Sequence, residues 1–355
     1  MAGLNVLIMG ATYGSLLASK LVLAGHRCTM VCLPAEAEVI NADGLRLRLP
    51  IRGRDEPVNI HSADAAGSVV ALGPDDADPG AFDMVALAMQ EPQYRLPGVR
   101  DLLARVAASN VPTMSIMNMP PLPYLARLPG VDVASLRPAY ADATVWDGFD
   151  PSKMTLASPD PQAFKPEGEP LNLLQVSLPT NFKVAAFDDP ADTAMLRRME
   201  ADILDIRFDP GDGPIELPVK LRVHDSLYVP LAKWAMLLTG NYRCITADGP
   251  RAIRDAVHAD KDASAEIYEW VRQLCVTLGA DPSDLVPFEK YANAASGLSK
   301  PSSAARALFG GAPFIERVDK VVQILAAQRG LSHPSVDETV RLVDAQLERN
   351  RASAA

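Results

Sequence analysis

The chain has 355 residues, a length that favours two domains, and its 48% of hydrophobic and 22% of charged residues are ordinary for a globular protein. This composition argues against a disordered, collagen-like or coiled-coil chain, and no apolar run reaches the roughly 20 residues of a membrane-spanning helix. The net charge of −10, without a cluster of Lys and Arg, argues against a nucleic acid or a membrane as partner. An anionic small molecule remains compatible with it, since net charge does not determine local sites.

The cysteines and the start of the chain indicate a cytoplasmic protein. The four cysteines, Cys28, Cys32, Cys244 and Cys275, are too few for a disulfide scaffold and lack the spacing of a zinc site. The five histidines are equally scattered, so no metal is expected. The first residues lead straight into a strand pattern without a basic segment or a cleavage site, so no signal peptide is expected either.

The first 32 residues predict a βαβ unit. Residues 4–9 (LNVLIM) form a short apolar run typical of a buried strand, and the turn GATYGS follows at once. A helical pattern, SLLASKLVLAG, ends at Gly25, and residues 26–32 read as a second strand. Strand, glycine turn, helix and strand at this spacing make a right-handed βαβ unit.

The same alternation continues and then changes to helices. Strands are predicted at 83–89 and 112–117, with a helix at 98–108 between them. Residues 130–215 add late, partly antiparallel strands and a helix near 192–204, and four helical patterns follow after residue 219. We therefore predict an α/β fold with a Rossmann-type, doubly wound sheet in residues 1–215 and a mostly helical domain in residues 216–355.

The glycine-bearing turn is the first candidate functional site. A turn between a strand and a helix can hold the pyrophosphate of a dinucleotide on backbone N–H groups and on the helix N-terminus. Compared with G-x-G-x-x-G, either Thr12 and Ser15 replace the last two glycines, or Gly14 is the third glycine of a shorter loop. A bound dinucleotide is predicted, and a βαβ turn without a ligand is the alternative. The predicted cofactor-binding residues of the turn are Gly10, Ala11, Thr12, Tyr13, Gly14 and Ser15.

The end of the second strand leaves the choice of cofactor open. An acidic residue there favours the ribose hydroxyls of NAD, and an arginine favours the 2′-phosphate of NADP. The chain has CLPAE at residues 32–36, which carries neither signature, and Arg27 lies at the other end of that strand.

Six segments occur in an order typical of one family of reductases. They are GATYGSLLASKLVLAGHRCTMVC, NADGLRL, DMVALAMQEPQ, SIMNMPP, LAKWAMLLTGNYRC and KPSSAARALFGGAPFIERVDKVV. On these segments the chain resembles the ketopantoate reductase (2-dehydropantoate 2-reductase) family, as a divergent member. The resemblance implies a helical C-terminal domain like that of 6-phosphogluconate dehydrogenase. It also implies NADPH-dependent reduction of a 2-keto acid held between the domains.

The resemblance also implies roles for single residues. The catalytic lysine falls on Lys233 and the substrate-orienting glutamate on Glu316. Hydride delivery to a ketone builds alkoxide charge, which a lysine ammonium can neutralise and then protonate. Against this role, a lysine in an otherwise apolar helix is often only a surface residue that extends its ammonium to water. The substrate residues are Asn118, Asn241 and Ser302 or Ser303, and Gln90 and Asn118 join the turn in holding the cofactor.

Three departures from the family pattern affect the expected substrate. Gln90 occupies the position of a lysine, Leu237 replaces the middle asparagine of the catalytic helix, and Asn118 is followed by Met119 instead of glycine. Each change removes a polar or flexible partner. They favour a bulkier or more apolar carbonyl or imine compound over ketopantoate.

Two other functions remain open. An opine-dehydrogenase-like or imine-reducing enzyme shares the two-domain layout, and the segment PLPYLAR at 121–127 resembles part of that group. In such an enzyme His224, beside Asp225, would carry the acid–base role instead of Lys233. A cofactor-free metabolite-binding or partner-binding protein is the third hypothesis. Thr12, Gln90 and the lack of an acidic or arginine signature after the second strand all weaken the cofactor site. In each case a homodimer is expected.

Overall fold

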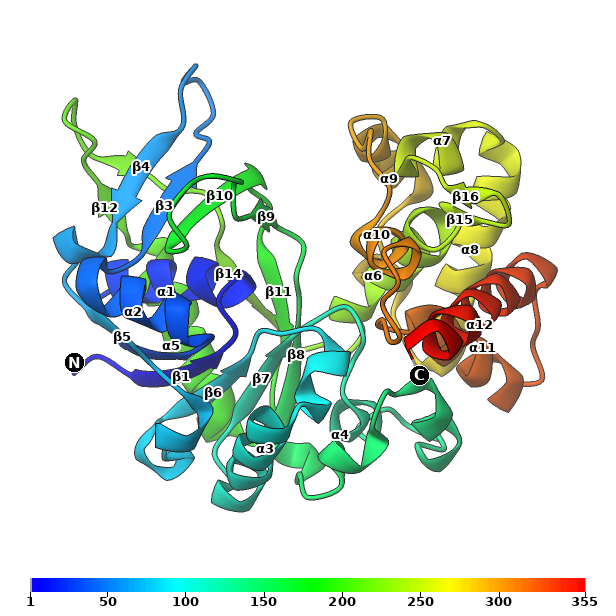
Figure 1. Ribbon diagram of the computed structural model, residues 1–355, viewed down its shortest axis with the longest axis horizontal. Coiled ribbons are helices and arrows are strands. Elements are labelled where there is room, and N and C mark those ends of the chain that lie inside the picture. Colours follow the sequence, from blue (N-terminus) through cyan, green and yellow to red (C-terminus); the bar gives the residue numbers. More distant parts are fainter. Residues whose placement is uncertain (1, 355) are drawn as a thin grey trace. The chain divides into compact units, whose positions relative to one another are not determined.

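The computed structural model describes residues 2–354, which form two compact units (Figure 1). The first unit contains the chain up to residue 89, together with residues 93–124 and 145–225. The second contains residues 90–92, 125–144 and everything from 226 onward. Two short segments from the N-terminal half of the sequence therefore belong to the helical unit. The sequence pattern predicts two continuous domains instead, which meet at residue 215.

An eight-stranded sheet forms the centre of the first unit, with the strand order β14-β11-β8-β7-β6-β1-β2-β5. All neighbouring strands are parallel except β8 and β11, which are antiparallel. The strands are β1 (Asn5–Met9), β2 (Arg27–Val31), β5 (Ser68–Leu72), β6 (Met84–Leu87), β7 (Thr113–Ile116), β8 (Met154–Ser158), β11 (Phe182–Ala185) and β14 (Leu221–His224).

Helices cover both faces of this sheet, which confirms the predicted doubly wound fold. Val6 and Ile8 of β1 belong to one hydrophobic core with residues of α1 and α5, whereas Leu7 points to the opposite face, on which α3 lies (Figure 1). Strands buried on both faces read as continuous apolar runs, and this is why the sequence showed them clearly. The helices are α1 (Tyr13–Leu23), α2 (Pro34–Asp43), α3 (Pro97–Ser109), α4 (Leu122–Leu125) and α5 (Pro190–Leu204).

A second, smaller sheet has the order β4-β3-β10-β9 and was not predicted. Leu47 and Leu49 of β3 share the core that contains Leu17 and Leu21 of α1. Polar residues alternate with these leucines, so only one face of the strand is buried. The strands are β3 (Arg46–Leu49), β4 (Val58–His61), β9 (Gln162–Phe164) and β10 (Leu173–Leu178), and the two-stranded pair β12 (Arg207–Phe208) and β13 (Ile215–Glu216) completes the unit.

The second unit is mostly helical, as predicted. Of the four helical patterns, the last three form long helices, and the first is divided into a 3₁₀ turn, a short α-helix and a π-helical turn. The elements are η8 (Pro230–Ala232), α6 (Lys233–Met236), η9 (Leu237–Asn241), β15 (Ile245–Thr246), β16 (Gly249–Pro250), α7 (Ile253–His258), α8 (Lys261–Leu278), α9 (Phe288–Ala295), α10 (Ser303–Phe309), α11 (Val318–Gln328) and α12 (Pro334–Ala354).

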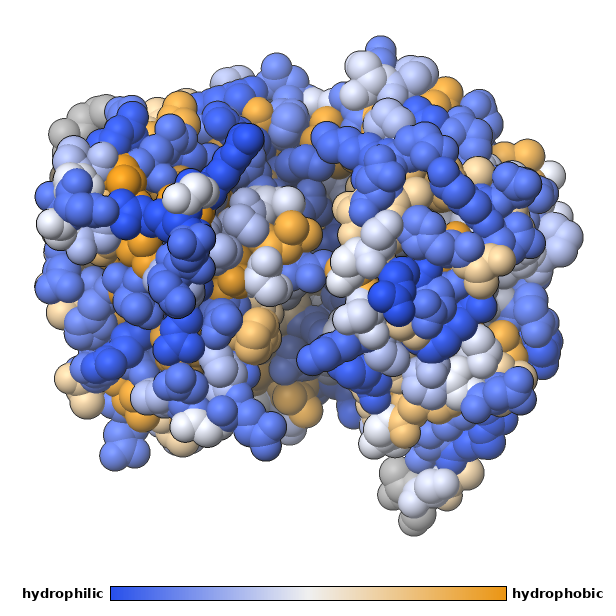
Figure 2. Space-filling model, turned by 90° about the horizontal axis from the view of Figure 1, so that it is seen from above, coloured by the Kyte–Doolittle hydropathy of each residue, from blue (hydrophilic) through white to orange (hydrophobic). Residues whose placement is uncertain are grey.

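The face shown in Figure 2 is mostly hydrophilic, with hydrophobic residues in small scattered patches. Acidic side chains outnumber basic ones in the sequence by 44 to 34, which accounts for the net negative charge. Within residues 2–354, no helix is long and apolar enough to cross a membrane.

Candidate functional site

The turn after β1 lies at the point where the sheet changes direction. The chain passes from β1 to β2 on one side and later returns to β6 on the other. The N–H of Gly10 donates to the carbonyl of Val31, the last residue of β2, at 2.8 Å. A Cβ on Gly10 would lie 2.7 Å from the carbonyl oxygen of Ala88 and 2.6 Å from Cγ of Met89, just after β6. With φ at +109° as well, the position requires glycine. Ligands of open α/β sheets bind at such switch points.

The geometry of Gly14 distinguishes the two possible registers of the glycine motif. A Cβ on Gly14 would lie 2.8 Å from Cγ2 of Ile8 in β1, so the glycine lets α1 pack closely on the strand. Close packing of helix and strand is the role of the third glycine in G-x-G-x-x-G. Ser15 instead turns its hydroxyl inward and donates to the carbonyl of Ala11 at 2.7 Å. The turn is thus one residue shorter than the standard motif.

The beginning of α1 is able to receive a phosphate group. The side chain of Thr12, at the N-cap, makes no capping hydrogen bond, and the first turn contains no acidic residue. Backbone N–H groups at a helix N-terminus and the positive end of the helix dipole attract an anion. Thr12 is exposed and stands where the standard motif has its second glycine, so its side chain narrows the approach to the backbone.

Asn118 and Gln90 follow neighbouring strands. Asn118 lies two residues after β7 in the first unit and is partly buried. Gln90 lies three residues after β6, is exposed, and belongs to the second unit.

The helix that carries Lys233 and Asn241 changes its winding between these two residues. It begins at Lys233 as an α-helix, and from Leu237 it forms the π-helical turn η9, in which the N–H of Tyr242 donates to the carbonyl of Leu237 at 2.9 Å. A π-helical turn holds more residues than the 3.6 of an α-helix, so each residue advances by a smaller angle. The separation of about 80° expected for eight α-helical residues therefore shrinks, and both side chains come closer to one face.

The hydroxyl of Tyr291, from α9, explains the wide turn. It donates to the carbonyl of Met236 at 3.1 Å, and a Cβ on Gly240 would collide with it. A side chain inserted into the hydrogen-bond ladder is a known cause of helix distortion. Gly240 provides the space for this insertion.

The two candidate serines have different surroundings. Ser302 is 2% exposed; its hydroxyl donates to the backbone carbonyl of Asn241 at 2.6 Å and accepts the N–H of Ala305 at 3.0 Å as the N-cap of α10. Ser303 is exposed. Ser302 therefore fixes the backbone that carries Asn241, whereas the side chain of Ser303 faces solvent.

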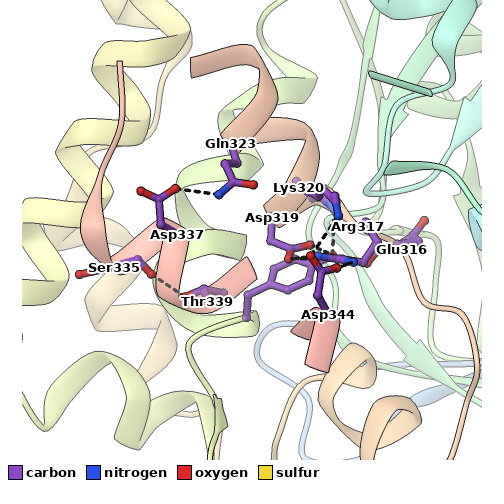
Figure 3. Close-up of polar contacts among 11 residues, drawn as sticks. Glu316, Arg317, Asp319, Lys320, Gln323, Ser335, Asp337, Thr339 and Asp344 are labelled. Carbon is purple, nitrogen blue, oxygen red and sulfur yellow. Dashed lines mark hydrogen bonds and ion pairs between the residues drawn. The ribbon is translucent and has the colours of Figure 1, made fainter. Parts of the chain in front are cut away.

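Glu316 precedes α11 and is held by a buried polar network (Figure 3). The hydroxyl of Tyr242 donates to the carbonyl of Glu316 at 2.5 Å and accepts the N–H of Val318 at 3.0 Å. The guanidinium of the next residue, Arg317, is 2.9 Å from Asp319, which has no exposed surface, and 2.5 Å from Asp344. Because Tyr242 adjoins Asn241, this network links the backbones of the two candidate residues Asn241 and Glu316.

A further buried carboxyl group in this unit, that of Glu91, was missed by the sequence reasoning. Glu91 is 2% exposed, and its carboxylate oxygens accept the N–H of Ala141 at 3.2 and 3.3 Å. The pKa of Glu91 is raised to about 8, mainly by burial and in part by the charge of Glu316, while the hydrogen bond from the N–H of Ala141 acts in the opposite direction. The available signal was an acidic residue soon after a fully apolar strand. Perturbed acids of this kind occur preferentially at functional sites.

Among residues 2–354, no three or more His, Cys, Asp or Glu side chains are grouped in a way that could hold a metal ion. Neither the buried Cys275 nor the partly buried Cys32 has an activated thiol. Burial raises the pKa of Cys275 to about 12 and that of Cys32 to about 11.

Comparison with known proteins identifies the fold. No family model and no curated protein matches the sequence. Among solved structures, the 2-dehydropantoate 2-reductase of Methylococcus capsulatus is similar with a TM-score of 0.65 and 11% identity, over 98% of each chain. A ketopantoate reductase of Ralstonia eutropha gives 0.58 and 15%, over 98% of this chain and 99% of that one. The dimeric ketopantoate reductase of Staphylococcus aureus gives 0.59 and 11%, over 98% and 100%. The chain thus has the fold of the ketopantoate reductases along its whole length, which confirms the resemblance as one of fold.

Proposed function

We propose that the protein is an NAD(P)H-dependent oxidoreductase that reduces a 2-keto acid or a related carbonyl compound. The turn at Gly10 carries this proposal: it lies at the switch point of the sheet, requires glycine, and leads into an uncapped helix N-terminus. A nicotinamide nucleotide, when bound, supplies the hydride. Residues of the turn, with Gln90 and Asn118, would hold it.

The residues of the second unit suit the remaining chemistry. Hydride arrival at a carbonyl carbon leaves negative charge on oxygen, and Nζ of Lys233 can neutralise that charge and donate a proton. Glu316, fixed through Tyr242 and Arg317, would accept a hydrogen bond from a hydroxyl of the substrate and orient it. Asn241 and Ser303 add polar contacts, and Ser302 acts through the backbone of Asn241.

The expected substrate is less polar than ketopantoate. Leu237 occupies the middle position of the catalytic helix, between Lys233 and Asn241, where the family has an asparagine. A pocket that lacks this amide favours a bulkier or more apolar keto acid or imine, since an unpaired polar group on the ligand would lose its hydrogen bonds to water.

Titration with NADPH and NADH, followed by calorimetry, tests the proposal directly. We expect one of them to bind with micromolar affinity, and a screen of 2-keto acids and imines then identifies the substrate. If neither binds at millimolar concentration, the enzyme assignment is wrong, and a cofactor-free metabolite-binding or partner-binding protein takes its place.

Two substitutions distinguish Lys233 from the rival His224, which ends β14 in the first unit. We expect Lys233→Ala to lower kcat at least 100-fold, as typical for loss of a general acid, with the affinity for the cofactor unchanged. His224→Ala should retain most of the activity, and Lys290→Ala on α9 is the control for loss of a lysine. Full turnover by Lys233→Ala together with inactive His224→Ala would favour the opine-dehydrogenase-like reading.

A homodimer belongs to the same proposal. The Staphylococcus aureus protein with this fold is dimeric, and a dimer of this chain would elute at twice its mass of 38.0 kDa. Sedimentation at micromolar concentration measures this directly. A cytoplasmic location is proposed on the reduced cysteines alone.

A further inference from the structure

The end of β2 brings together two charged side chains from distant parts of the first unit. Cys32 and Leu33 follow β2, and Glu36 lies in the first turn of α2. One carboxylate oxygen of Glu36 accepts the N–H of Leu33 at 3.1 Å, and the other is paired with the ammonium group of Lys165. Lys165 directly follows β9, 129 residues further along the chain. The fold, not the local sequence, brings this lysine to the strand end.

The pair adjoins the turn that is proposed to hold the pyrophosphate. Gly10 is bonded to Val31, and Cys32 is the next residue. Burial raises the pKa of the Cys32 thiol, the charge of Glu36 raises it further and the charge of Lys165 lowers it, so both charges act at this residue. In a doubly wound sheet, the end of the second strand is the place where the ribose beyond the pyrophosphate is read.

The proposed nicotinamide-nucleotide function is the basis of this inference. We propose that Lys165 is the residue that recognises a 2′-phosphate on the adenosine ribose, so that the protein prefers NADPH to NADH. Each carboxylate oxygen of Glu36 already has one donor, so the ribose hydroxyls of NADH would have to share these oxygens with Leu33 and Lys165. The ammonium of Lys165 has three donors, of which the pairing with Glu36 uses one.

The neighbouring Leu33 supports the same assignment. It is 69% exposed although it is apolar, and it stands at the N-cap of α2 beside Cys32. An exposed apolar side chain next to a phosphate-binding position offers a surface on which a purine base can pack. Lys165 keeps 22% of its side chain exposed and is therefore accessible to a ligand from solvent.

Calorimetric titration of the wild type and three variants with NADPH and with NADH tests the role of Lys165. We expect the wild type to bind NADPH at least tenfold more tightly than NADH. Lys165→Met should lose at least tenfold in affinity for NADPH and change by less than twofold for NADH, and Lys165→Arg should keep the preference. Lys183→Met is the matched control, because Lys183 is also partly exposed and pairs with Asp160 at 3.1 Å in the same unit.

The outcomes separate this inference from the proposed function. Retained binding of NADH by Lys165→Met would show that the variant is folded and that only the 2′-phosphate contact is lost. An equal loss for both cofactors, no loss for NADPH, or a wild type that prefers NADH would overturn the role of Lys165 while cofactor binding stands. A wild type that binds neither would overturn both.

Discussion

At the scale of single residues, the second unit buries the Glu91 carboxyl and offers it backbone N–H donors. Its hydrogen bonds come from backbone N–H groups, and the charge of Glu316 acts against its ionisation. Charging a buried acid beside another negative charge is unfavourable, so Glu91 holds its proton into the neutral range. A protonated carboxyl group can donate as well as accept hydrogen bonds, whereas an ionised carboxylate can only accept them.

Glu91 should make the stability of the protein depend on pH. The pKa of Glu91 is about 8 in the folded state and about 4.5 in the unfolded state, so the folded state binds more protons between these values. This contribution to stability is fully present below pH 4.5 and is lost as the pH rises to 8, by about 5 kcal/mol. In Glu91→Gln this fall should be absent, because the amide does not ionise. Urea unfolding at pH 5 and pH 9 measures the difference.

An exposed acid provides the control for this prediction. Glu348→Gln, on α12, should keep the pH dependence of the wild type. If Glu91→Gln loses stability between pH 5 and pH 9 as steeply as the wild type does, Glu91 is ionised throughout and its burial has another explanation.

At the scale of elements, the change of winding from α6 to η9 reduces the angle around the helix axis between Lys233 and Asn241. The hydroxyl of Tyr291 holds the carbonyl of Met236, and the wide turn brings Asn241 toward the face of Lys233. Widened turns are found at functional sites more often than elsewhere. On this basis we treat Tyr291 as a positioning residue for the proposed reaction.

Removal of the Tyr291 hydroxyl should change substrate binding more than catalysis. In Tyr291→Phe the carbonyl of Met236 can return to an α-helical hydrogen bond, which rotates Asn241 away from its place. We expect KM for the keto acid to rise about tenfold, equivalent to about 1.4 kcal/mol, and kcat to change less than threefold. Loss of the hydrogen bond itself should lower the free energy of unfolding by about 1 kcal/mol.

Tyr268→Phe separates this effect from simple destabilisation. Tyr268 is buried, stacks on Tyr291 with a centroid distance of 5.4 Å, and donates to the carbonyl of Val286 at 3.0 Å. Its substitution should lower stability to a similar extent and leave KM unchanged. Equal changes of KM in both variants would mean that Tyr291 has only a structural role.

The sequence predicted those elements in which burial follows a regular pattern along the chain. Strands buried on both faces, such as β1, β6 and β7, and helices with one apolar face, such as α8, carry a periodic signal that depends only on local sequence. The wide turn at Leu237–Asn241 carries none, because its cause, Tyr291, is 50 residues away. The neighbourhoods of Glu91 and Lys165 also depend on distant segments, so side-chain spacing could not reveal them.

At the scale of the whole molecule, each unit has a hydrophobic core of its own, as an independently folding domain does. The first buries a continuous core between its sheet and α1, α2 and α5, and the second buries its own helices, among them Val321 and Leu325 of α11. The proposed adenosine subsite, from Gly10 to Lys165, lies wholly in the first unit. A ligand that binds one domain stabilises that domain by mass action and leaves the other unaffected unless the two unfold together.

A fragment of the cofactor should therefore protect one unit selectively. Adenosine 2′,5′-bisphosphate at 100 times its Kd contributes about 2.7 kcal/mol to the unit that binds it. For a domain of roughly 200 residues this raises Tm by about 5–10 °C. Hydrogen exchange on heating should show slower opening of β1 and β2 and an unchanged rate in α8. At the same fragment concentration, a tenfold weaker Lys165→Met variant should keep no more than about 1.4 kcal/mol of this stabilisation. Equal protection of α8 would show that the two units unfold as one, because the fragment's stabilisation would then reach residues that it does not touch.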